Sequence, residues 1–206
     1  MGYRDRIAGD STSLLWRMVN RPAVNSKRNA LLWGVAWMII SAIGGWHLRV
    51  APVSIVGYDL YGYLPLLWHL LVNVVVCVVP ISLFMVAALI VNRHTNVGEL
   101  FARMLFAHWP ATLLLLPAMF VGEVKYALLN NDLAKVFESD VVAALLFSAL
   151  LFVVVVWVLY WGYVAFRAAT QRGRWLTMLV YFNALVLSVL LTNEVLDATY
   201  LWLRMR

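Results

Sequence analysis

The sequence has 206 residues, of which 64% are apolar and 13% are charged, and its formal net charge is +6. Soluble domains are about half apolar and about a quarter charged, and a chain of this length cannot bury so much apolar surface in one water-soluble core. This composition excludes an ordinary soluble domain, and it requires the lipid bilayer as a solvent for much of the chain.

Five stretches approach the roughly 20 apolar residues that a helix needs to cross a bilayer. They lie at about 30–46, 64–91, 105–122, 141–166 and 176–201. The runs are continuous rather than alternating, which favours helices over a β-barrel. We therefore expect an all-α polytopic membrane protein. Residues 1–29 would form a cytoplasmic amphipathic segment, and residues 30–206 would form a bundle of five transmembrane helices.

The basic residues are divided unequally between the two sides of this predicted topology. Eleven of the 16 Lys and Arg residues precede the first span or lie in the second and fourth connections, and five lie on the other side. Short cytoplasmic loops carry the excess of Lys and Arg. The N-terminus is therefore expected in the cytoplasm and the C-terminus outside. Because the charge follows the membrane sides, we do not expect nucleic-acid binding.

Several polar residues fall near the outer ends of the predicted spans. An ionisable side chain inside a membrane is costly, so it often marks a functional site. His69 is the deepest of them, and Asn73 lies one turn further in on the same helix face. The candidate polar site comprises His47, His69, Asn73, Glu123, Glu194 and Asp197. The alternative is an outer rim that meets headgroups and water without forming a site.

A second group of candidates lies in the predicted cytoplasmic loops. It contains Arg93, His94, Arg103, Arg172 and Arg174. These residues satisfy the positive-inside rule, and they also offer a docking surface for a partner or for anionic lipid. Small residues at Gly34, Ser41 and Gly45 predict close helix packing, within the bundle or between two copies of the chain. Trp and Tyr near the span ends, including Trp109 and Trp161, predict an interfacial aromatic belt.

Motifs for catalysis are missing: the sequence contains no HExxH, GxSxG or Walker pattern. We therefore expect a non-enzymatic protein without a cofactor or a metal. The first functional hypothesis is a membrane accessory or scaffold protein that assists a transporter or a trafficking system through a membrane-protein partner or self-association. The alternative is a small channel or transporter with a polar site at His69, Glu123 and Glu194. A weaker third possibility is an intramembrane enzyme acting on lipids, with Glu194 and Asp197 as its carboxylates.

Four segments of the chain resemble the Yip domain family of five-span membrane proteins. They are the lead RMVNRP at 17–22, the turn GELFA at 98–102 with AHWP at 107–110, the span end WVLYWGYVAF at 157–166, and the last span after a basic turn. The resemblance covers about residues 14–200. It implies a five-helix bundle with a cytoplasmic N-terminus, and it brings no catalytic residues.

The length of the polar lead bears on which branch of that family the chain resembles. Eukaryotic members, which interact with Rab GTPases, carry a longer N-terminal cytoplasmic region than the 29 residues before the first span here. The resemblance therefore implies a multi-pass protein of the bacterial inner membrane rather than a Rab-binding protein. For such members it implies an accessory role beside transport or envelope machinery.

Overall fold

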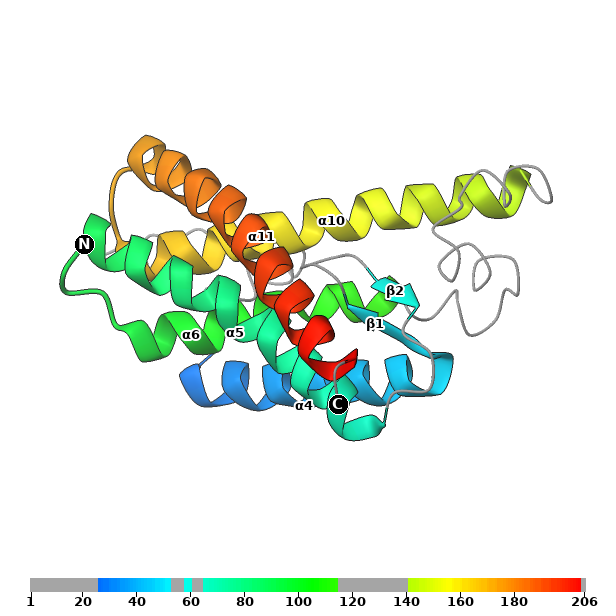
Figure 1. Ribbon diagram of the computed structural model, residues 1–206. Coiled ribbons are helices and arrows are strands. Elements are labelled where there is room, and N and C mark those ends of the chain that lie inside the picture. The colour runs from blue at the N-terminus through cyan, green and yellow to red at the C-terminus, as the bar shows by residue number, and fades with distance from the viewer. Residues whose placement is uncertain (1–25, 53–57, 61–64, 115–140, 205–206) are drawn as a thin grey trace.

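The computed structural model describes residues 26–52, 58–60, 65–114 and 141–204. This part of the chain is helical except for one short β-hairpin (Figure 1). In chain order its elements are α4 (Lys27–Leu48), β1 (Val50–Pro52), β2 (Tyr58–Leu60), α5 (Leu66–Val91), α6 (Val97–Ala107), the 3-10 helix η1 (Trp109–Leu114), α10 (Val141–Thr170) and α11 (Arg174–Arg204). Of the N-terminal segment expected at 1–29, residues 1–25 lie outside the described residues.

Four helices are long and apolar enough to cross a membrane. They are α4, α5, residues 144–170 of α10 and residues 174–202 of α11. Only 28–39% of the most apolar stretch of each helix is buried inside the protein. The remaining side chains are partly or fully exposed, and a lipid bilayer would keep this apolar surface out of water. These four helices confirm four of the five expected spans.

The segment expected to form the third span, 105–122, is organised differently in its described part. An α-helix begins at Val97, where Asn96 caps it by accepting a 3.1 Å hydrogen bond from the Glu99 amide. It ends at Ala107 and gives way to the 3-10 helix η1, because Pro110 has no amide hydrogen to continue the α-helical pattern. Residues 115–140, with Glu123, lie outside the described residues, so the third span remains a prediction.

The two ends of the molecule can be told apart by the contacts between helix ends. At one end, the Asn92 side chain donates a 3.0 Å hydrogen bond to the carbonyl of Thr170, joining the ends of α5 and α10. The start of α4 lies beside the start of α6, since a Cβ on Gly98 would be 2.9 Å from Lys27 Nζ. We call this the basic end. The opposite end, the hairpin end, carries the antiparallel strands β1 and β2 and the start of α10 (Figure 1).

Glycines set the closest approaches between elements. A Cβ on Gly34 of α4 would lie 2.8 Å from Leu105 Cγ and 3.0 Å from the Leu105 carbonyl carbon in α6. A Cβ on Gly45 would lie 2.6 Å from the Val50 carbonyl oxygen. The small-residue face of α4 therefore serves packing within the bundle, one of the two uses expected from the sequence.

The core between α5, α10 and α11 is aromatic. Tyr181 of α11 stacks on Phe84 of α5 with ring centroids 5.1 Å apart, and Phe166 of α10 packs against both rings. The Tyr181 hydroxyl donates a 2.9 Å hydrogen bond to the Leu159 carbonyl of α10. Gly162 makes room for this hydroxyl, because a Cβ there would lie 2.5 Å from it. This hydrogen bond fixes where α11 crosses α10.

Candidate functional site

His69 and Asn73 are buried on α5, one turn apart. Their exposed fractions are 1% and 5%. The Asn73 amide donates a 2.8 Å hydrogen bond to the His69 carbonyl, which anchors the side chain on its own helix. Both ring nitrogens of His69 lack a hydrogen-bond partner among the described residues. Burying a polar ring without a hydrogen-bond partner costs free energy.

Asn73 also lines a cavity of about 40 Å³ between α4, α5 and the α6–η1 junction. Its polar lining residues are Ser41, Asn73, His108 and Thr112, and the single cysteine, Cys77, lines it as well. A polar cavity needs roughly 10–15 Å³ to hold one water molecule. This cavity therefore has room for a few waters or for one small polar solute.

The cavity lies where the α-helix breaks. The His108 backbone amide donates a 3.4 Å hydrogen bond to the Leu105 carbonyl, three residues back as in a 3-10 helix. The Ala111 amide donates to the His108 carbonyl at 3.0 Å. The Met104 carbonyl, which His108's amide would reach in a continuous helix, instead lies 2.8 Å from His108 Nδ1. Because a carbonyl only accepts, Nδ1 carries the proton, and in the neutral ring Nε2 keeps its lone pair.

Aromatic rings close the cavity on one side. Trp37 of α4 stacks on Trp109 with centroids 4.8 Å apart. Trp109 in turn contacts Trp157 and Trp161 of α10 at 5.8 Å and 6.1 Å. The belt interpretation is wrong for Trp161, which is only 3% exposed, whereas Trp109 is partly buried against the same cluster. Trp33, by contrast, is 53% exposed, as a belt residue would be.

The remaining members of the predicted polar site do not join this cavity. His47, Glu194 and Asp197 are exposed, and Glu123 lies outside the described residues. Near the end of α11 the buried side chains are Thr192, Leu196 and Tyr200, spaced one turn apart, and the two carboxylates fall between them in the sequence. In the described ranges no group of three or more His, Cys, Asp or Glu residues is placed to hold a metal ion.

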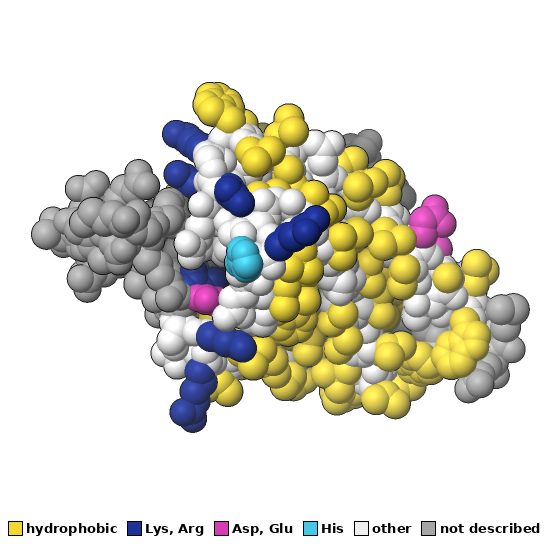
Figure 2. Space-filling model, turned by 90° about the vertical axis from the view of Figure 1, so that its left-hand side faces the viewer, with side chains coloured by type: hydrophobic (Ala, Val, Ile, Leu, Met, Phe, Trp, Pro, Cys, Tyr) yellow, Lys and Arg dark blue, Asp and Glu magenta, His cyan; other side chains and the backbone are white. Residues whose placement is uncertain are grey.

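The basic end carries most of the predicted docking residues on its surface. Arg93, His94, Arg172 and Arg174 are exposed. Figure 2 looks onto this end and shows dark blue Lys and Arg side chains gathered around a histidine, with an apolar flank beside them. The Asn92 side chain holds the α5–α6 connection against the end of α10 and also accepts a 3.1 Å hydrogen bond from the His94 amide.

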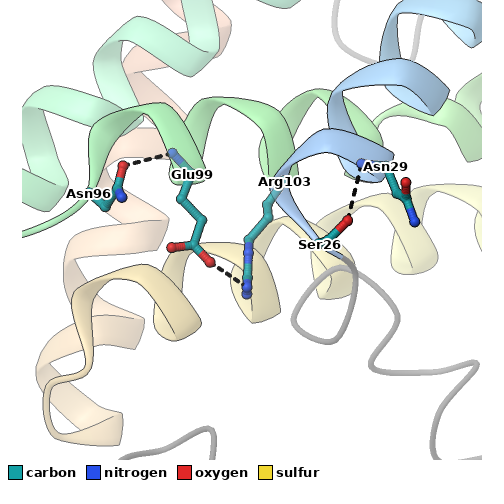
Figure 3. A network of polar contacts seen from close by, with 5 residues as sticks. All are labelled: Ser26, Asn29, Asn96, Glu99 and Arg103. Carbon is teal, nitrogen blue, oxygen red and sulfur yellow. Dashed lines mark hydrogen bonds and ion pairs between the residues drawn. The ribbon is translucent and has the colours of Figure 1, made fainter.

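Arg103 is the exception, and its assignment to a docking surface is wrong. It is 1% exposed, and its Nη2 donates a 2.6 Å charge-assisted hydrogen bond to Glu99 Oε1 (Figure 3). The sequence placed it in a loop, but α6 begins at Val97. Arg103 therefore lies in the second turn of a packed helix, four residues after Glu99, and its side chain pairs with Glu99 inside the bundle.

Sequence reasoning found Asn73 but missed Ser41, His108 and Thr112 as partners in one cavity. A usable signal was present, because Pro110 interrupts an apolar run just after His108. In a membrane, irregular backbone is tolerated only where protein buries it or where it lines a cavity.

No protein-family model, curated protein or solved structure matches this chain.

Proposed function

We propose that this protein is a small membrane channel or transporter that accommodates a small uncharged polar species, water included, in the cavity between α4, α5 and η1. The observation that carries the proposal is a helix break at His108 beside a cavity whose mostly apolar wall carries four polar side chains, Ser41, Asn73, His108 and Thr112. Transporter sites are typically built at discontinuous helices. This proposal retains the channel hypothesis drawn from the sequence but moves its site away from Glu194.

The chemistry of the lining supports an uncharged species. Hydroxyls of Ser41 and Thr112, the amide of Asn73 and the imidazole of His108 offer both donors and acceptors without a fixed charge. The volume of about 40 Å³ favours a species of the size of water or slightly larger. His69, one turn from Asn73 toward the hairpin end, would extend the polar path.

Asn73→Leu tests the proposal with a close control in the same chain. Asn183 of α11 makes the same kind of bond, donating at 2.8 Å to the Leu179 carbonyl, but it is exposed. Stopped-flow light scattering on proteoliposomes would measure water and small-solute flux. We expect Asn73→Leu to lower the flux at least several-fold and Asn183→Leu to leave it unchanged. Equal flux in both variants, or no flux above that of empty liposomes in the wild type, would refute the proposal.

A second candidate function, the accessory or scaffold protein, is favoured by the basic end. Three separate segments bring Lys27, Arg28, Arg93, Arg172 and Arg174 to one exposed face. Such a face suits an acidic surface of a membrane-protein partner. Affinity purification in mild detergent should yield a reproducible partner that is lost in the Arg172→Glu, Arg174→Glu double variant. Equal recovery of that partner with the variant would reject this candidate.

We also propose that the chain crosses the membrane five times, with the basic end in the cytoplasm and the C-terminus outside. In this proposal it is a Yip-like protein of the bacterial inner membrane. The distribution of Lys and Arg supports the orientation. The crossing between α5 and α10, the third of the five, is supported by the direction of these two helices. Both end at the basic end, so α10 starts at the hairpin end and the chain that connects them has to cross from one end to the other. Reporter fusions after residue 206 should be active only outside the cytoplasm, and cytoplasmic activity would contradict the topology.

A further inference from the structure

A surface groove of about 460 Å³ runs along α5 toward the basic end, and its described lining residues are Val86, Leu89, Ile90 and Arg93. The first three lie on the last two turns of the helix, and Arg93 follows the helix by two residues. The spacing of three and four residues places Val86, Leu89 and Ile90 along one side of α5. Arg93 lines the same groove just beyond the helix end, so three aliphatic side chains lead to one guanidinium group.

The position of Arg93 is held by the contacts of its neighbour. The Asn92 amide donates to the Ala88 carbonyl at 2.8 Å, and the Asn92 side chain bonds the end of α10. Arg93 itself is exposed. The 26 residues of α5 span roughly 39 Å, more than the roughly 30 Å of a hydrocarbon core. The end of α5 therefore reaches the level of the lipid headgroups.

We infer that this groove binds an anionic phospholipid, with an acyl chain along Val86, Leu89 and Ile90 and the phosphate at Arg93. Ile90 is 78% exposed and Val86 is 56% exposed, so both offer apolar surface to a chain. A guanidinium group recognises phosphate through a planar fork of donors. The exposed Arg172 and Arg174 at the same end add to the positive potential that favours an anionic headgroup. This site is separate from the cavity, so neither proposal depends on the other.

Native mass spectrometry of the full chain in detergent tests the site with phosphatidylglycerol and phosphatidylcholine of matched acyl chains. Arg93→Gln should weaken phosphatidylglycerol binding about five-fold, the ratio expected for losing one cationic contact of about 1 kcal/mol. It should leave phosphatidylcholine binding unchanged. Arg28→Gln is the matched control, because it removes the same charge from an exposed position on α4 at the same end. It should leave the affinity for both lipids unchanged.

Ile90→Trp tests the acyl-chain half of the site without changing charge. The bulky ring would fill the groove at an exposed position where the fold tolerates it, and phosphatidylglycerol binding should fall. An equal loss in Arg93→Gln and Arg28→Gln would show a general charge effect and overturn the proposal. So would unchanged binding in Ile90→Trp, or binding of glycerol phosphate as tight as that of the whole lipid, since either marks a headgroup site without an acyl chain.

Discussion

Gly34→Ala is the perturbation for which the structure makes the most definite prediction. Gly34 lies where α4 crosses α6, and an added Cβ would meet Leu105 Cγ at 2.8 Å and the Phe106 amide nitrogen at 3.0 Å. Cβ atoms essentially never come closer than 3.0 Å to another heavy atom. One of these neighbours is backbone in a packed helix and cannot move alone. The two helices would therefore have to separate by a few tenths of an ångström.

The expected cost combines two opposing effects. Overpacking a well-packed core destabilises by about 1–3 kcal/mol, whereas replacing glycine by alanine inside a helix stabilises by about 0.5–1 kcal/mol. The net effect is a loss of roughly 0.5–2 kcal/mol in the free energy of unfolding. For a chain of about 200 residues this lowers the melting temperature by roughly 1–8 °C.

Circular dichroism melting in detergent measures this change, with Gly173→Ala as the control. Gly173 has no heavy atom within 4 Å of its Cβ position, and its φ is not positive. Alanine there should leave the melting temperature unchanged or raise it slightly. An unchanged or higher melting temperature in Gly34→Ala would contradict the close contact between α4 and α6 at Gly34.

Three further substitutions probe polar contacts by the same melting measurement. Glu99→Gln keeps the shape of the side chain but removes the charge that faces Arg103 at 2.6 Å. It should lower the free energy of unfolding by about 1–3 kcal/mol. An unchanged melting temperature would count against a structural role for this pair. Tyr181→Phe should cost about 1 kcal/mol through the lost bond to the Leu159 carbonyl. Gly162→Ala should be less damaging in the Tyr181→Phe background than alone, because its clash is with the hydroxyl at 2.5 Å; additive losses would contradict this.

The four confirmed spans could be predicted because each is a continuous apolar run that length alone identifies. The third expected span could not be placed, because the helix begins in the polar turn at Val97 and Pro110 breaks it inside the apolar run. Arg103 was likewise expected in a loop, because it precedes the apolar run. Only the start of α6 at Val97 places it one turn after Glu99, inside the bundle.

The face that each span turns inward was the least predictable feature. Helix α5 is apolar on nearly all sides, so its sequence periodicity does not distinguish the lipid-facing side from the packed side. Depth suggested that His69 and Glu194 would meet, yet packing buries the first and exposes the second. Pro110 marks the 3-10 turn after His108 in the sequence, but the cavity also needs α4 and α5 to pack beside this turn, which no local pattern predicts.

The only cysteine of the chain offers the most direct test that the cavity is the route for a solute. Cys77 lines the cavity, so Hg²⁺ bound to its sulfur would obstruct a space of about 40 Å³. We predict that Hg²⁺ inhibits flux in wild-type proteoliposomes, that a thiol reductant restores it, and that Cys77→Ala is active and insensitive to Hg²⁺. Wild-type flux that is unaffected by Hg²⁺, or inhibition that persists in Cys77→Ala, would contradict the cavity as the site of transport.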